Sequence, residues 1–210
     1  MPRFNKSSVI GIDFDNTLIS YDEVFFNHAL SLNLISPEAG KNKKEVRDKI
    51  RQLSDGETIW QKVQAYVYSK GIAQASLNKG AANFIKACVD QGIKVYVVSH
   101  KTEYSPFDTH RVNLQQAALN WMAANDFFKE DGLGLEPIQV YFEVTRVLKI
   151  ERLQSLGCTH FIDDLEEVFL EKTFPKGVEK ILFAPQVDAN FLNDMKVFKN
   201  WEKINEHFFS

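Results

Sequence analysis

A short apolar run that leads straight into two aspartates constrains this chain more than any other stretch. Residues 9–12 are apolar without alternation, which predicts a strand buried on both faces, as in a parallel sheet. Asp13 and Asp15 follow, and side chains two apart in an extended chain point to the same side, so the two carboxylates can converge. Such acids repel each other unless a cation, a proton or a substrate requires them there; the plainer alternative is a pair of loop acids facing water. Asn16 and Thr17 then break the strand and offer polar atoms at a turn.

Composition bounds the class of protein. The chain has 210 residues, 44% of them hydrophobic, and a net charge of -3, which suits one globular domain with at most a small insertion. The balanced charge gives no electrostatic case for binding nucleic acid, no apolar run approaches the ~20 residues that span a bilayer, and the polar N-terminus does not resemble a signal peptide. Cys88 and Cys158 lie in apolar-patterned segments, which favours core packing over a disulfide or a metal site. We therefore expect a soluble cytoplasmic protein without nucleic-acid or membrane partners; the oligomeric state stays open.

Residues 20–74 carry helical patterns only. A first stripe of apolar residues ends near Leu32, Ser36-Pro37 is expected to begin a second helix that runs to about Leu53, and a third stripe is stopped by Gly71. The sequence thus predicts an all-helical insertion at 20–74 between two parts of a core, 1–19 and 75–210.

In the second part of the core, predicted strands alternate with predicted helices. Strands are expected at 93–98, 138–142, 159–162 and 181–184, with helices at 78–92, 145–156 and 198–209 among the segments between and after them. This alternation predicts an α/β fold, a three-layer α/β/α sandwich around a parallel sheet. In the helix at 145–156, the residues expected to point inward are Val147, Leu148, Ile150 and Leu153.

Polar residues close two of these strands. Ser99 follows the strand expected at 93–98, and Asp163 and Asp164 follow the strand expected at 159–162. Because the carboxyl ends of parallel strands share one edge of a sheet, these residues should lie on the same edge as Asp13. Taken alone, Ser99 is explained equally well by an ordinary turn at the end of a strand. A helix-capping acid is the alternative for one of the two aspartates, but it does not easily explain both.

Together these segments resemble a known family. Asp13-Phe14-Asp15-Asn16-Thr17 is similar to the Asp-x-Asp-x-Thr signature of the haloacid dehalogenase-like superfamily, and Ser99 and the double Asp163-Asp164 stand where that family has its second and fourth motifs. The resemblance covers about residues 8–184 apart from the insertion. It implies a five-stranded Rossmann-like core of strand order 5-4-1-2-3, and it makes residues 20–74 a small helical cap of the C1 type.

The resemblance also implies roles for the site residues. It makes Asp13 the nucleophile that forms an aspartyl-phosphate, Asp15 the acid and base, and Ser99 a ligand of the transferred phosphoryl group. The family's third motif is a lysine that neutralises nucleophile and phosphate. Lys149 is the best match, with Arg146 and Lys101 as rivals.

A metal ion completes the expected site. Its oxygen ligands would come from Asp13, the backbone carbonyl of Asp15, Asp163 and Asp164, a donor set that suits Mg²⁺. Four further residues at the same edge are candidates for binding substrate: Asn16, Thr17, His100 and Lys101.

The expected function is a Mg²⁺-dependent phosphatase that acts on a small phosphorylated metabolite, of the sugar phosphate or nucleotide class. Asp15 favours cleavage of a phosphate ester over cleavage of a carbon–chlorine bond, because a halide leaves without protonation. A non-catalytic phosphate-binding or assembly module and a phosphotransferase remain alternatives, since a fold does not fix a function. The natural substrate is left open by the sequence.

Overall fold

The computed structural model describes residues 7–187 and 191–209. Residues 1–6, 188–190 and 210, which the sequence analysis assigns to the core, lie outside the described residues. Contacts divide the chain into two compact units: unit 1 comprises residues 1–19, 77–101 and 122–210, and unit 2 comprises residues 20–76 and 102–121.

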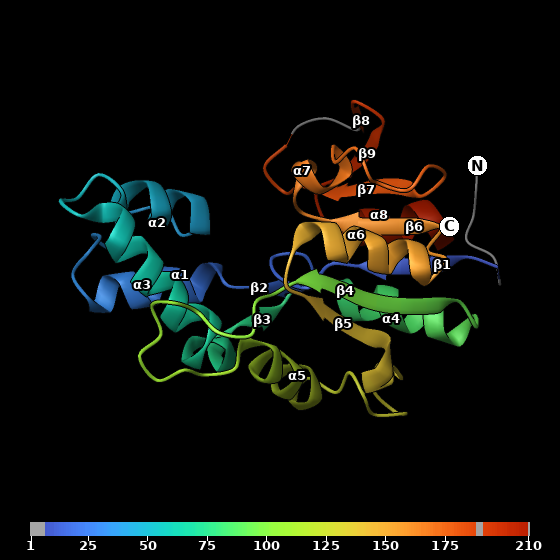
Figure 1. Ribbon diagram of the computed structural model, residues 1–210, viewed down its shortest axis with the longest axis horizontal. Coiled ribbons are helices and arrows are strands. Elements are labelled where there is room, and N and C mark those ends of the chain that lie inside the picture. Colours follow the sequence, from blue (N-terminus) through green and yellow to red (C-terminus); the bar gives the residue numbers. More distant parts are fainter. Residues whose placement is uncertain (1–6, 188–190, 210) are drawn as a thin grey trace. The chain divides into compact units, whose positions relative to one another are not determined.

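Unit 1 is built on a sheet in the order β5-β4-β1-β6-β7-β9-β8, in which all neighbouring pairs are parallel except β8 and β9 (Figure 1). The strands are β1 (Val9–Ile12), β4 (Lys94–His100), β5 (Val140–Glu143), β6 (His160–Asp163), β7 (Glu179–Phe183), β8 (Phe191–Leu192) and β9 (Met195–Phe198). The first five of these have the expected order. The sheet differs from expectation in its extension beyond β7, because Phe198 ends β9 instead of opening the last helix.

Helices cover both faces of this sheet. They are α4 (Ala81–Asp90), α6 (Arg146–Ser155), α7 (Glu166–Phe169) and α8 (Trp201–Phe209), with a 3₁₀ turn at Pro137–Gln139, while α5 (Leu114–Ala124) crosses the boundary between the units. Figure 1 shows α6 in front of the sheet and α4 and α8 behind it, and Phe84 of α4 packs 5.2 Å from the ring of Trp201 in α8. The α/β/α sandwich predicted from the alternation of elements is therefore confirmed.

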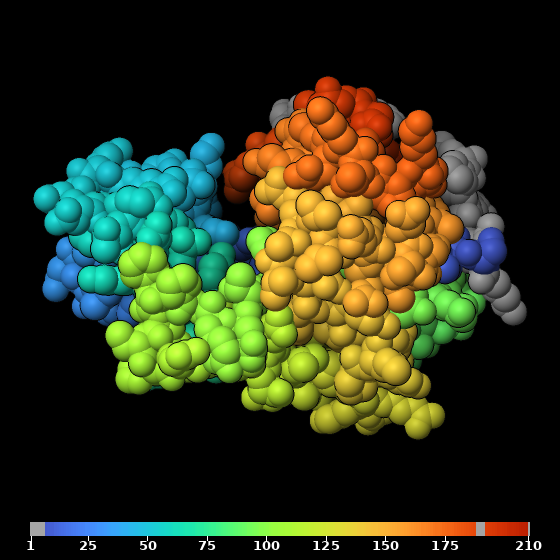
Figure 2. Space-filling view, viewed as in Figure 1, coloured from blue at the N-terminus to red at the C-terminus, as the bar shows by residue number. Residues whose placement is uncertain are grey.

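A glycine of the central strand lies under side chains of α6 and β6. A Cβ on Gly11 of β1 would lie 2.8 Å from Cδ2 of Leu153 and 2.9 Å from Cδ2 of Phe161. Real Cβ contacts are longer than this, so these two side chains would have to shift if residue 11 were not glycine. In the space-filling view, the yellow-orange atoms of α6 and its flanking residues cover this face of the sheet (Figure 2).

The buried face of α6 differs from the one expected. Val147 and Leu148 are 47% and 39% exposed, whereas Lys149, Ile150 and Leu153 are buried. The expectation that Val147 and Leu148 point inward was wrong, because it ranked side chains by hydrophobicity alone. A buried lysine is tolerated when carboxylates accompany it into the interior, as the site described below shows.

Unit 2 is mainly helical. Its elements are α1 (Asp22–Ser31), α2 (Lys43–Ile50), α3 (Gly56–Tyr68) and a 3₁₀ helix (Lys70–Gln74), flanked by the paired two-residue strands β2 (Ile19–Ser20) and β3 (Ser76–Leu77). Its core includes the stacked rings of Phe25 and Trp60, 4.9 Å apart. Contacts also place residues 102–121 in this unit, and the indole of Trp121 donates a hydrogen bond to the carbonyl of Ala75 at 3.0 Å.

The expected start of the second helix was wrong. The helix begins at Lys43 because the side chain of Asn42 caps it, accepting a hydrogen bond from the Glu45 N–H at 2.9 Å, and it ends at Ile50. Ser36-Pro37 lies before the helix, outside any regular element. The first helix ends at Ser31, next to Leu32 as expected, and Leu32 itself is 51% exposed. Across residues 7–187 and 191–209, no helix has both the length and the apolar character needed to cross a bilayer.

Candidate active site

The carboxyl ends of three adjacent strands bring the predicted residues of unit 1 together. The N–H of Asp13 continues the ladder between β1 and β6 by donating to the Ile162 carbonyl at 2.8 Å. On the other side of β1, Ser99 ends a buried stretch of β4 and its hydroxyl donates to Oδ1 of Asp13 at 2.9 Å. Asp163 ends β6. The shared edge that parallel strands impose is thus occupied as the sequence predicted.

Lys149 is the basic residue that contacts this group. Its Nζ lies 2.5 Å from Oδ1 of Asp13 and 2.6 Å from Oδ2 of Asp163, and its side chain is 2% exposed. The two rivals are engaged elsewhere: Arg146 pairs with Glu171 at 3.0 Å, and Lys101 pairs with Asp15. The geometry therefore favours Lys149 as the lysine that neutralises Asp13.

Burial and charge perturb this ion pair strongly. Desolvation raises the pKa of Asp13 to about 7; the nearby Asp163 carboxylate acts in the same direction, and Lys149 opposes both. Burial by itself lowers the pKa of Lys149, but the carboxylates of Asp13 and Asp163 outweigh it and raise that pKa above its ordinary value. The ammonium of Lys149 thus faces two buried carboxylates, so these three side chains together carry a net negative charge when both acids are ionised.

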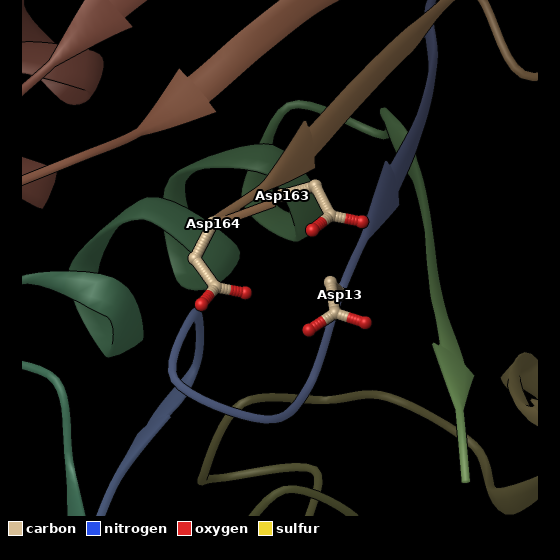
Figure 3. A group of neighbouring side chains, drawn as sticks. All are labelled: Asp13, Asp163 and Asp164. Atoms are coloured by element: carbon tan, nitrogen blue, oxygen red, sulfur yellow. The ribbon is translucent and has the colours of Figure 1, made fainter. Parts of the chain in front are cut away.

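The acids also form a donor set suited to a cation. Carboxylate oxygens of Asp13, Asp163 and Asp164 lie within 4.8 Å of one another. Figure 3 shows Asp163 and Asp164 at the end of β6, with Asp13 across from them after β1. All three candidate ligands are carboxylates, whose oxygens are the donors that hard divalent ions such as Mg²⁺ prefer. The residues present therefore fit a hard divalent cation.

Asp15 and Lys101 form a second ion pair. The ammonium of Lys101 donates to both carboxylate oxygens of Asp15, at 2.9 and 2.7 Å. His100, another predicted substrate ligand, points its Nε2 at the Val144 carbonyl, 3.1 Å away, on the exposed side of β4. Burial lowers the pKa of His100, and the charges of Lys149 and Asp15 also act on it, so His100 lies near these residues and its role in binding substrate stays a prediction.

The turn after Asp15 is tied to distant parts of unit 1. Asn16 adopts a positive φ of 61°, a conformation that asparagine tolerates better than most residues, and the hydroxyl of buried Thr17 donates to Asp164 at 3.4 Å. The carbonyl of Thr17 accepts hydrogen bonds from Asn78 at 2.9 Å and from the Trp201 indole at 3.0 Å. The side chains predicted to bind substrate at this turn thus also hold it in place.

Asn78 and Trp201 were missed as site-supporting residues. Trp201 lies on the buried apolar face of the last helix, and an apolar pattern gives no information about where an indole N–H points. Asn78 was expected only as the start of a helix. Neither residue carries a local signal for a contact with a turn some 60 or 184 residues away in the sequence.

No family model and no curated protein sequence matches this chain. Solved structures do match it. A haloacid dehalogenase-like hydrolase from Streptococcus pneumoniae aligns with a TM-score of 0.63 at 16% identity, over 97% of this chain and 99% of that one. A predicted phosphoglycolate phosphatase from Haemophilus somnus 129PT gives 0.56 at 14% identity, over 97% and 99%.

A dehalogenase in an intermediate complex is also similar, with a TM-score of 0.58 at 11% identity over 99% of each chain. At these identities the likeness concerns the fold, and the similar proteins include a predicted phosphatase as well as a dehalogenase. The strand order, the acids at the edge of the sheet and these matches agree: the chain has the haloacid dehalogenase-like fold.

Proposed function

We propose that this protein is a Mg²⁺-dependent phosphatase that hydrolyses phosphate monoesters of small molecules. The observation that carries the proposal is the burial of Lys149 between Asp13 and Asp163, with Asp164 close by. A carboxylate can attack a phosphate dianion only where cations cancel part of their repulsion, and this cluster supplies one cation and the oxygen ligands for another.

In the proposed reaction, an oxygen of Asp13 attacks phosphorus, the bond to the leaving oxygen breaks, and Asp15 gives that oxygen a proton. Asp15 then takes a proton from the water that attacks the aspartyl-phosphate, which releases phosphate and restores Asp13. Ser99 and Lys149 hold oxygens of the transferred group. Asp13, the Asp15 carbonyl, Asp163 and Asp164 would hold Mg²⁺, which when bound neutralises negative charge on the phosphoryl group.

Asp15 separates this proposal from dehalogenation. A halide departs without a proton, so a dehalogenase needs no acid two residues after its nucleophile. Asp15 is present, and its side chain is 21% exposed, enough to meet a substrate. Retention of this acid also argues against a module that only binds phosphate.

The proposed substrates are sugar phosphates or nucleotides rather than nucleic acids or membrane lipids. We assign the helical insertion at residues 20–74 a part in choosing among such small molecules, as lids do in enzymes of this fold. Its bounds as a functional cap are part of the proposal.

The test is phosphate release from p-nitrophenyl phosphate, sugar phosphates and nucleoside monophosphates, with MgCl₂ and with EDTA. We expect Mg²⁺-dependent release that Asp13→Asn abolishes and that the matched surface change Asp194→Asn leaves intact; Asp194 is an acid of an exposed pair with Lys180. Inertness towards every phosphate ester alongside tight binding of phosphate would indicate a binding module. Metal-independent release of chloride from 2-chloropropionate would indicate a dehalogenase.

A further inference from the structure

Lys101 contacts the acid that the proposed reaction uses as its proton carrier. Both hydrogen bonds from its ammonium group end on the same carboxylate, at 2.9 Å to Oδ1 and 2.7 Å to Oδ2 of Asp15. Two hydrogen bonds from one buried ammonium group to both oxygens hold the carboxylate in position, although a compact ammonium does not fix its plane as a guanidinium would. Lys101 is therefore placed to hold the side chain of Asp15 in one position.

The surroundings of Lys101 make it a rigid holder. Its side chain is 3% exposed, and its ammonium lies 5.7 Å from the centre of the ring of buried Phe14. Its backbone N–H donates to the Glu143 carbonyl at 2.8 Å, which ties its main chain to the end of β5. A buried side chain on a fixed backbone has few other conformations, so Lys101 can hold its partner where a surface lysine could not.

The two partners are exposed to different extents. Lys101 is almost fully enclosed, while the side chain of Asp15 is 21% exposed. The buried Lys101 can therefore keep Asp15 in place, while the more exposed Asp15 can contact a substrate. Lys149, by contrast, contacts Asp13 and Asp163, so the two lysines serve different acids.

We propose that Lys101 is a positioning residue that orients the Asp15 carboxylate towards the leaving oxygen of the substrate, rather than a ligand of the phosphate. This inference rests on the proposed function, because it assigns Lys101 its role through Asp15. A displacement of about 1 Å in a reacting group can cost on the order of 10²-fold in rate. Loss of Lys101 should therefore matter most where the leaving group needs its proton.

The experiment compares Lys101→Met with the unmodified chain on two substrates. An alkyl phosphate has a leaving oxygen that must be protonated, whereas p-nitrophenyl phosphate releases a stable phenolate that needs no acid. On the alkyl ester we expect kcat/KM, which covers the steps up to departure of the leaving group, to fall by about 10²-fold, and on p-nitrophenyl phosphate we expect a much smaller fall in kcat/KM. Because Asp15 also activates the water that hydrolyses the aspartyl-phosphate, kcat should fall on both substrates. In an Asp15→Asn background, Lys101→Met should cause no further loss on the alkyl ester.

Lys180→Met is the matched control. Lys180 also forms a 2.7 Å ion pair, with Asp194, and also lies near an aromatic ring, 5.4 Å from the centre of Phe174. It should leave kcat on both substrates unchanged. If Lys101→Met does not fold, Lys101→Gln carries the same comparison, because its amide can still donate one hydrogen bond to Asp15 and a smaller fall is expected.

The outcomes separate the two proposals. Absence of Mg²⁺-dependent turnover by the unmodified chain overturns the proposed function and this inference with it. Turnover in which Lys101→Met lowers kcat/KM equally on both substrates, or lowers it further in the Asp15→Asn background, overturns the role of Lys101 alone. A rise in KM for both esters with kcat unchanged would make Lys101 a phosphate ligand instead.

Discussion

Replacing Lys149 by methionine should destabilise the metal-free protein severely. The change keeps most of the volume of the side chain and removes the ammonium that lies 2.5 Å from Asp13 and 2.6 Å from Asp163. At an effective dielectric constant of about 20, each of these contacts corresponds to an attraction of about 6 kcal/mol before the cost of desolvation. Returning the lysine to water on unfolding offsets several kcal/mol of this.

The net loss should be about 3–5 kcal/mol, the range seen when one partner of a buried ion pair is removed. That is a large fraction of the 5–15 kcal/mol that stabilises a typical domain. A lysine on an exposed helix face is a suitable control: Lys86 of α4 pairs with Asp90 at 2.9 Å and is 43% exposed, so Lys86→Met should cost less than about 1 kcal/mol.

The measurement is urea unfolding with EDTA, followed by far-UV circular dichroism, and then again with MgCl₂. A metal bound to the same carboxylates replaces part of the missing positive charge, so added Mg²⁺ should raise the midpoint of Lys149→Met more than that of the unmodified chain. A loss below about 1 kcal/mol in EDTA would falsify the reasoning, because it would mean that the two buried carboxylates do not depend on Lys149. If Mg²⁺ raised the unfolding midpoint of both proteins equally, the result would indicate that the metal does not bind to these carboxylates.

Three further predictions concern packing, thiols and pH. Gly11→Ala should lower the free energy of unfolding by about 1–3 kcal/mol in urea, because its Cβ would overlap Leu153; a neutral result would show that α6 can shift outward. Burial raises the pKa of the Cys88 thiol and of the Cys158 thiol to about 12, so both should react with Ellman's reagent only after unfolding, and rapid reaction of the native protein would contradict their burial. Burial and the charge of Lys196 lower the pKa of His207, so the unfolded chain binds more protons than the folded chain near that pKa. The free energy of unfolding should therefore fall as the pH drops from about 7 to about 5. In thermal melts, His207→Gln should make this dependence on pH weaker.

The sequence by itself determined the class of fold and the members of the acid cluster. The apolar residues 9–12 and the acids that follow them are neighbours in the sequence, so the strand and its acidic end can be predicted locally. The same is true of the two acids at the end of β6. Parallel strands leave their carboxyl ends no choice but one edge of the sheet, so Asp13, Ser99 and Asp163 could be grouped before any coordinates were known. The catalytic roles of these residues remain predictions.

Tertiary structure decided how charges are matched, where the family resemblance had only made Lys149 the best match among three basic residues. Lys149 is buried in a helix whose pattern favoured Val147 and Leu148 as inward residues, because Asp13, 136 residues away, compensates its charge. The same holds for the Lys101–Asp15 pair and for the Trp201 indole on the turn after β1. The spacing of hydrophobic residues along the chain indicates which side chains are buried. It does not indicate which distant residue compensates a buried charge or accepts a hydrogen bond from a buried N–H group.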